Sequence, residues 1–182
     1  LKIQKKGTMY GHQDDPFYGT TWEWEKGRSD TYELVGDYPA VMGFDLGGLE
    51  LDSDKNLDGV PFEWMREEAV KQYENGGFVT FSWHLRNPKT GGNAWDVSDN
   101  QTVHSILPEG ENHELFVSWM QKVADFMLTL TTTDGQPIEF IFRPWHEYNG
   151  SWFWWGENNC SAEEYKQLWN MTQEYLNAEL PG

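Results

Sequence analysis

Residues 138–156 read IEFIFRPWHEYNGSWFWWG, an apolar segment that leads through a polar turn into a tryptophan-rich loop. The first five of them, 138–142, are too few for a helix and are rich in β-branched and aromatic side chains, so we predict a strand. Its apolar character indicates burial on both faces, as in a parallel sheet. Pro144 lacks the amide hydrogen that a further ladder bond requires and therefore ends the strand. Glu147 consequently lies just beyond the carboxyl end of a strand, where barrel and open α/β enzymes place catalytic groups.

The residues around Glu147 suit a carboxyl group that transfers protons to and from a sugar. Four tryptophans share this loop: Trp145, Trp152, Trp154 and Trp155. Apolar surroundings favour the neutral, proton-donating form of a carboxyl group. Aromatic rings also bind the C–H face of a pyranose while its hydroxyl groups stay free for hydrogen bonds. We interpret the segment as a carbohydrate-cleaving site. The alternative is that the tryptophans are core residues and that His146 and Glu147 form an ordinary surface pair.

The rest of the chain alternates between strand and helix patterns. Three further strand patterns occupy residues 8–12, 40–44 and 78–83. Apolar residues recur at helical spacing over 61–73, 114–130 and 161–176. The last helix is opened by the capping-box pattern from Ser161 to Glu164. Residues 20–35 show no clear period, and we expect a loop there with at most a short helix. Because strands that alternate with helices pair in parallel through right-handed crossovers, the pattern predicts an α/β fold of four βα units.

Polar residues also stand at the other predicted strand ends. Asp14 and Asp15 follow the first strand, Asp45 follows the second and His84 follows the third. The carboxyl ends of parallel strands lie at one edge of a sheet, so we expect His84 to share an edge with the end of the fourth strand. Residues 86–112 form a long connection, and long connections inside a compact domain are usually functional. We therefore predict that this connection lies over the cleft.

Two acidic clusters raise the question of a metal ion. His12, Asp14 and Asp15 lack a convincing further ligand, which favours a hydrogen-bonding cluster over a metal site. Residues 52–63 space their acidic side chains as a calcium loop does, but Leu57 occupies the position where the sharp turn requires glycine. We therefore predict neither a metal nor a cofactor.

Composition excludes some classes of partner. Thirty acidic residues against thirteen basic ones give a net charge of -17, whereas nucleic acids and anionic membrane surfaces require a basic footprint. No apolar run reaches membrane length, so we predict no nucleic-acid binding and no membrane insertion. A neutral polysaccharide stays compatible. Aromatic residues make up 16% of the chain and include 11 tryptophans, an excess that a sugar-binding cleft explains better than a general core does.

The segment from Arg143 to Gly156 resembles the acid/base segment of glycoside hydrolase family 26, the β-mannanases. Four other segments resemble the same family in the same order: residues 11–15 (GHQDD), 36–41 (GDYPAV), 81–84 (FSWH) and 87–96 (NPKTGGNAWD). The resemblance implies the first four βα units of a (β/α)8 TIM barrel, since a complete barrel takes about 250 residues. Residues 1–182 would then be the N-terminal portion of one catalytic domain.

The same resemblance implies an activity and a set of site residues. The activity is that of a retaining endo-β-1,4-mannanase, which hydrolyses mannan, galactomannan or glucomannan. Glu147 would be the acid/base, His84 and His146 would contact the sugar at the cleaved bond, and Arg143 would orient the carboxylates through charge-assisted hydrogen bonds. The remaining substrate contacts would be the tryptophans that line the cleft: Trp95, Trp152 and Trp155. The family's nucleophile is a later glutamate, expected beyond Gly182, and no acidic residue of this chain matches it.

Two alternatives stay open at this point. The first is a related enzyme that cleaves β-glucan or β-xylan, because subsites flanking the cut decide the sugar. The second is a non-catalytic mannan-binding protein, although binding modules are usually all-β and the helical patterns argue against one. Without a nucleophile and the remaining strands, we predict that the 182-residue chain alone is inactive. A polymeric substrate cannot enter a cell, so we expect a secreted, periplasmic or cell-surface location, with no signal peptide in this sequence.

Overall fold

The computed structural model describes residues 7–180 and divides the chain into two compact units. The first unit comprises Leu1–Phe44, Val60–Phe81 and Leu130–Phe142, and the second comprises Asp45–Gly59, Ser82–Thr129 and Arg143–Gly182. The chain therefore passes from the first unit to the second each time it leaves the second, third or fourth strand.

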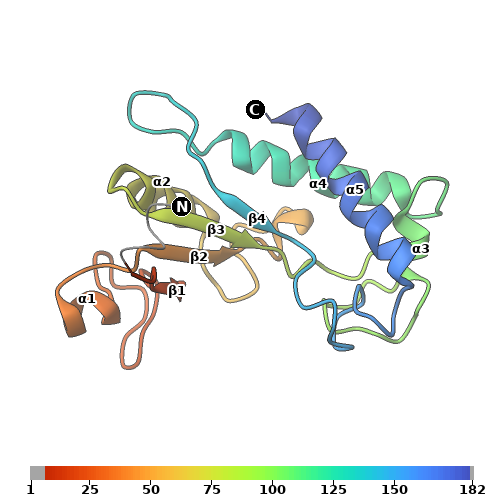
Figure 1. Cartoon of the computed structure of the whole chain (residues 1–182), viewed down its shortest axis with the longest axis horizontal. Helices are drawn as coiled ribbons and strands as arrows, with labels where there is room; N and C mark the ends of the chain where they lie inside the picture. Colours follow the sequence, from red (N-terminus) through yellow and green to blue (C-terminus); the bar gives the residue numbers. More distant parts are fainter. Residues whose placement is uncertain (1–6, 181–182) are drawn as a thin grey trace. The chain divides into compact units, whose positions relative to one another are not determined.

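The first unit is built on a four-stranded sheet whose strands stand in chain order (Figure 1). The strands are β1 (Gly11–Gln13), β2 (Val41–Asp45), β3 (Phe78–Ser82) and β4 (Ile141–Arg143). Strand β1 pairs with β2 in parallel, with His12 opposite Met42. The amide of Asp14 continues this pairing by donating to the carbonyl of Gly43 at 2.9 Å. These findings confirm the predicted α/β fold with a parallel sheet.

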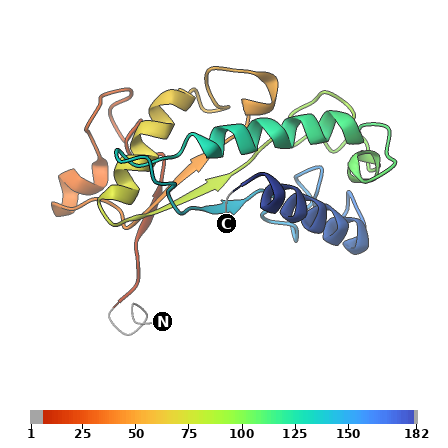
Figure 2. The same cartoon turned by 90° about the horizontal axis from the view of Figure 1, so that it is seen from above.

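Two helices complete the first unit, namely α1 (Asp30–Val35) and α2 (Phe62–Glu74). Figure 2 shows α2 along one face of the sheet. The predicted apolar spacing is confirmed here, since Phe62, Met65 and Ala69 are buried. Gly76 follows the helix with φ +82°, a left-handed conformation that favours glycine at a helix end. The expected short helix within residues 20–35 is α1.

The second unit consists of helices and long loops. Its elements are the 3-10 helix η2 (Leu49–Leu51) and the helices α3 (Thr102–Ile106), α4 (His113–Leu128) and α5 (Ala162–Glu179). Helix α4 packs against the other three elements and buries an apolar stripe: Phe116, Trp119, Met120, Val123 and Met127. At the start of α5, the Ser161 hydroxyl accepts from the Glu164 amide, and the Glu164 carboxylate accepts from the Ser161 amide. The predicted capping box is therefore present. Within residues 7–180, none of the helices combines the length and the apolar character needed to cross a membrane.

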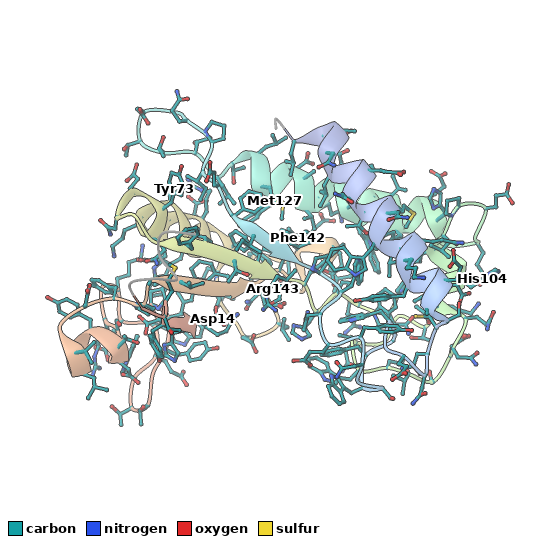
Figure 3. The ribbon with its side chains drawn as sticks, viewed as in Figure 1. Asp14, Tyr73, His104, Met127, Phe142 and Arg143 are labelled. Carbon is teal, nitrogen blue, oxygen red and sulfur yellow. The ribbon has the colours of Figure 1, made fainter. Side chains whose placement is uncertain are left out.

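Two predictions about local structure were wrong. The strand predicted over residues 138–142 occupies Ile141–Arg143, and it is not buried on both faces, since Ile141 is 53% exposed. In the described part of the chain, β4 is the last strand of the sheet, so its outer side has no neighbouring strand. Figure 3 labels Phe142 and Arg143 at its carboxyl end. The long connection 86–112 also contains α3, whose five residues are too few to show a helical period.

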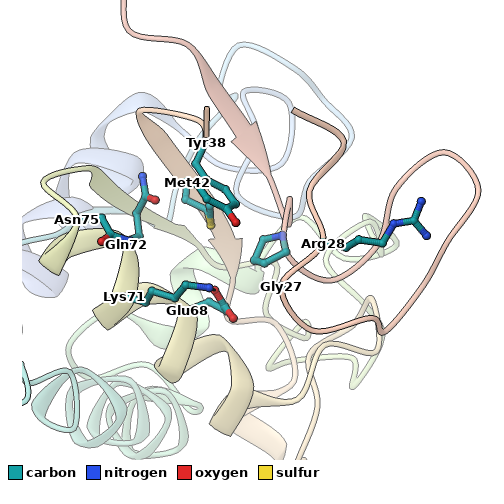
Figure 4. Close-up of a pocket in the computed structure, with 9 residues that line it drawn as sticks. Gly27, Arg28, Tyr38, Met42, Glu68, Lys71, Gln72 and Asn75 are labelled. Atoms are coloured by element: carbon teal, nitrogen blue, oxygen red, sulfur yellow. The ribbon is translucent and has the colours of Figure 1, made fainter. Parts of the chain in front are cut away.

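A small pocket in the first unit lies between α2 and the loops before and after α1 (Figure 4). Two of its polar side chains, Lys71 and Gln72, already have partners. The Lys71 ammonium group lies 3.1 Å from the Glu68 carboxylate and 6.0 Å from the centre of the Tyr38 ring. The Gln72 amide donates to the carbonyl of Pro39 at 2.9 Å. The pocket shares no residue with the predicted site, all of whose members belong to the second unit.

Candidate active site

The ends of three strands supply the polar residues of the site. Asp45 is the last residue of β2, His84 follows β3 by two residues, and Arg143 is the last residue of β4. His146 and Glu147 lie in the turn that follows β4. All five residues belong to the second unit. The parallel sheet thus gathers residues that are far apart in the sequence, as the strand-end argument predicts.

A continuous hydrogen-bonded chain joins Asp45, His84 and His146. The His84 Nδ1 atom lies 2.6 Å from Oδ2 of Asp45, and its Nε2 atom lies 3.1 Å from Nε2 of His146. The His146 Nδ1 atom lies 3.3 Å from the carbonyl oxygen of Arg143. The ring positions of both histidines are therefore fixed from two sides.

The Asp45 carboxylate is buried, with 2% of the residue exposed, and is held by donors on both oxygens. Oδ1 accepts from the amides of Gly47 at 2.8 Å and His84 at 3.2 Å, while Oδ2 accepts from the Ser82 hydroxyl at 2.6 Å. Burial by itself raises the pKa of this carboxyl group, but the hydrogen bond and charge of His84 and the other donors outweigh it, so the pKa of Asp45 is lowered. Asp45 is therefore a buried carboxylate whose hydrogen-bond donors compensate for the burial of its negative charge.

The pKa of His146 is lowered from its ordinary value. Burial is the main cause, because it disfavours the charged imidazolium. The neighbouring His84 is the second cause, since two cations in contact repel each other. His146 is therefore held in the neutral form near neutral pH.

Aromatic rings enclose the two histidines. Trp95 stacks on His84, with ring centres 5.1 Å apart and planes 7° apart. Phe153 contacts both histidines edge to face, at 5.1 Å from His84 and 5.3 Å from His146. Trp155 in turn stacks on Phe153 at 4.5 Å and donates its indole N–H to the carbonyl of His146 at 2.9 Å. The loop after β3 and the loop after β4 are thereby joined around the histidine pair.

Glu147 lies in a strained and exposed turn. Its φ of +57° is in the left-handed region, which side-chain-bearing residues adopt at a cost of roughly 1 kcal/mol or more. The turn is closed by the Gly150 amide, which donates to the carbonyl of Glu147 at 2.9 Å. The Trp152 indole N–H donates to Oε2 of the Glu147 carboxylate at 2.9 Å. The strained backbone and this hydrogen bond together present the carboxylate to solvent beside an exposed tryptophan.

The tryptophans divide into two groups. Trp95 and Trp152 are 46% and 51% exposed and can offer a ring face to a ligand. Three others are fully buried: Trp145, Trp154 and Trp155. The interpretation as core residues thus holds for these three. The prediction that Trp155 lines an open cleft is wrong for the described chain, because Phe153, His84 and His146 cover its ring.

This division predicts different stability effects. Trp155→Ala would leave a large cavity, and we expect a loss of about 3–5 kcal/mol in the free energy of unfolding. Trp95→Ala removes a half-exposed ring and one stacking contact, which costs about 1 kcal/mol. Denaturant unfolding of the two variants measures the difference. Equal losses would contradict the assignment of Trp155 to the core.

The strand-end cluster of the first unit forms hydrogen bonds, as predicted. The Asp15 carboxylate contacts Nδ1 of His12 at 2.6 Å and accepts from the Thr31 hydroxyl at 2.8 Å. The Asp14 carboxylate accepts from the Tyr18 hydroxyl at 3.0 Å. Among residues 7–180, no three His, Cys, Asp or Glu side chains lie close enough together to hold a metal ion.

Sequence reasoning missed two members of the site. Phe153 is 3% exposed and packs on both histidines, but an aromatic residue among tryptophans carries no distinguishing signal. Asp45 was recognised only as a strand-end carboxylate, and its contact with His84 spans 39 positions of sequence. The one available signal was that Asp45 stands at the end of β2, beside the end of β3.

The chain is thus a parallel α/β protein that gathers a carboxylate turn, a histidine pair and exposed tryptophans at the ends of its strands. The family pattern of glycosyl hydrolase family 26 matches residues 1–179, and the chain therefore belongs to that family.

Individual relatives agree with this assignment. A GH26 β-mannanase from Bacteroides ovatus matches 98% of this chain and 52% of its own chain, with a TM-score of 0.95 and 50% identity. A modular endo-β-1,4-mannanase from Cellulomonas fimi matches 94% of this chain and 39% of its own, with a TM-score of 0.83 and 34% identity. A mannan endo-1,4-β-mannosidase from Bifidobacterium adolescentis is 38% identical over 157 residues, which are 82% of this chain and 15% of that protein. The chain thus spans about half, or less, of the length of these relatives, and the predicted partial (β/α) barrel is confirmed at the level of fold.

Proposed function

We propose that this chain is the acid/base-bearing part of a retaining endo-β-1,4-mannanase. One observation carries the proposal: the exposed Glu147 carboxylate stands in a strained turn at the end of β4, bonded to Trp152. The relatives are β-mannanases and mannan endo-1,4-β-mannosidases, which supports mannan as the substrate. We further propose that residues 1–182 are the N-terminal portion of the catalytic domain.

Glu147 is the general acid and then the general base. It protonates the glycosidic oxygen as the bond breaks and later removes a proton from the attacking water. The exposed ring faces of Trp95 and Trp152 bind the C–H faces of the sugars on which they stack. The Nε2 atoms of His84 and His146 exchange their mutual hydrogen bond for hydrogen bonds with a sugar hydroxyl group. The Arg143 guanidinium orients the carboxylates by charge-assisted hydrogen bonds.

A retaining mechanism also needs a second carboxylate, roughly 5 to 5.5 Å from the first, that acts as nucleophile. Asp45 is unsuited to this role, since donors occupy both of its oxygens and its side chain is buried. We assign the nucleophile to a glutamate outside residues 1–182. Reaction with the C1 atom of the sugar then gives a covalent glycosyl-enzyme intermediate, which water cleaves.

Reducing ends released from mannan by the full-length protein test the activity. Parallel assays with galactomannan, glucomannan, β-1,4-xylan and mixed-linkage β-glucan decide the sugar. We expect release from the mannans to exceed release from xylan and β-glucan. A clear preference for xylan or β-glucan would leave a family 26 hydrolase but overturn mannan as its substrate.

Because such polymers do not enter cells, we propose a secreted, periplasmic or cell-surface location.

Substrate charge should affect turnover strongly. The chain carries a net charge of -17, so it repels polyanions, and we expect neutral mannan to be cleaved in preference to any polyuronate. Raising the salt concentration screens such repulsion, and neutral mannan should respond little to it. Reducing-end assays on both polymers at two salt concentrations measure this. Faster cleavage of the polyuronate at low salt would contradict the prediction.

A further inference from the structure

The hydrogen positions in the Asp45, His84 and His146 chain follow from counting donors and acceptors. Asp45 accepts on Oδ1 from two amides and on Oδ2 from the Ser82 hydroxyl and the His84 ring. The two amides can only donate, and together with the hydroxyl and ring partners they hold the pKa of this buried carboxyl group below its ordinary value. Asp45 is therefore ionised, and the short contact of 2.6 Å requires a hydrogen on Nδ1 of His84.

The far end of the chain fixes a second hydrogen. The Nδ1 atom of His146 faces the carbonyl oxygen of Arg143, and a carbonyl oxygen can only accept. His146 consequently carries a hydrogen on Nδ1. Between the two rings, the Nε2 atoms lie 3.1 Å apart, so one of them donates to the other. The two rings together hold three ring hydrogens, which is one more than two neutral imidazoles carry.

The extra proton is therefore shared by the pair, and its location is decided by the surroundings. His84 has an ionised carboxylate in contact, which favours an imidazolium. Among residues 7–180, no carboxylate contacts the His146 ring, which is half-buried among aromatic rings, and this burial disfavours charge there. The other charged groups that act on the pair are the Asp58 carboxylate near Asp45 and His84, and Arg143 and Glu147 near His146. The latter two have opposite effects on the charge of His146.

We propose that Asp45 is a positioning residue that keeps His84 as an imidazolium, with its Nε2–H directed at a neutral His146. A sugar hydroxyl group that inserts between the two rings can replace their mutual hydrogen bond, accepting from the Nε2–H of His84 and donating to Nε2 of His146. This role in substrate binding rests on the proposed function, whereas the proton assignment does not.

The variant Asp45→Asn separates charge from structure. Its amide oxygen can accept from Gly47 and from the His84 amide, while its amide nitrogen donates to Nδ1 of His84. His84 then carries its hydrogen on Nε2. Every hydrogen bond in the series from residue 45 through His84 to His146 is then satisfied with two neutral rings. The matched control is Ser82→Ala, which removes one donor to Asp45 without changing any charge.

Nitrogen-15 NMR of the histidine rings in the full-length protein tests the proton assignment directly. At neutral pH we expect both ring nitrogens of His84 to be protonated in the wild type and in Ser82→Ala. In Asp45→Asn we expect only one to be protonated. A neutral His84 in the wild type would overturn the proposal, whatever the activity of the protein.

The pH profile of mannan hydrolysis tests the positioning role. We expect Asp45→Asn to lower kcat/KM by about 10- to 100-fold at neutral pH, by analogy with the carboxylate partners that orient metal-binding histidines. In Asp45→Asn, acidification restores the imidazolium of His84, so the alkaline limb of this variant's pH profile should move to lower pH. The alkaline limb of the Ser82→Ala profile should stay at the wild-type pH. A uniform loss at every pH would mean a purely structural role and would overturn the positioning claim. Should the wild type cleave no mannan, the proposed function fails, and the NMR result still decides the proton assignment.

Discussion

Glu147→Gln should lower turnover on mannan by several orders of magnitude, with general acid–base catalysis alone accounting for about 100- to 10,000-fold. Glutamine keeps the shape of the side chain and can still contact Trp152, but it has no proton to give to the leaving oxygen. Substrate binding should persist, because the exposed tryptophans and the histidine pair are unchanged. Reducing-end release and equilibrium binding of mannooligosaccharides measure the two effects separately.

The same loop provides a matched control. Glu157 is an exposed carboxylate ten residue positions further on, and Glu157→Gln should leave turnover unchanged. A mannoside with a good leaving group supplies a second control, since such a bond breaks without an acid. Glu147→Gln should therefore lose much less activity in the first step on that substrate than on mannan. Near-normal mannan hydrolysis by the variant would remove Glu147 from the mechanism.

Residues 1–182 alone should show no measurable mannanase turnover, which is the second large effect. The proposal places the nucleophile outside these residues, and without it no glycosyl-enzyme intermediate can form. Strand β4 also has an open outer side, with Ile141 exposed, and open strand edges promote association between chains. We therefore expect the isolated chain to be oligomeric or poorly soluble as well as inactive.

The assay uses purified 182-residue protein, free of host glycosidases, with mannan as the substrate. The matched sample is the same protein with Glu147→Gln. Turnover that disappears in the variant would show that a carboxylate of this chain acts as the partner of Glu147. Asp14, Asp15 and Asp45 would then be the candidates, and the placement of the nucleophile outside the chain would be withdrawn.

Much of the fold could be predicted because its signals are local. The apolar spacing of α4 and the capping box at Ser161 depend on residues within a few positions of one another, and both were confirmed. The strand β4 was misplaced by three residues at its start, since strand pairing depends on a neighbour that periodicity does not reveal. Helix α3 was missed because its five residues make little more than one turn.

The site was predicted in part, and the limit has the same physical origin. Strand ends indicated Glu147 and His84 before any contact was known. Burial of individual tryptophans could not be predicted, because Trp152 and Trp155 stand three positions apart in one loop and differ from 51% to 0% in exposure. The contact between Asp45 and His84 depends on the pairing of β2 with β3, which only the folded chain provides.

The stereochemistry of the first product tests the retaining mechanism most directly. A proton NMR time course with the full-length protein and a reduced-viscosity mannan or a mannooligosaccharide records which anomer appears before mutarotation. We predict that the β-anomer accumulates first and that Glu147→Gln gives no product over the same period. An α-anomer first would mean an inverting enzyme, with its carboxylates roughly 6.5 to 9.5 Å apart, and would contradict the proposal.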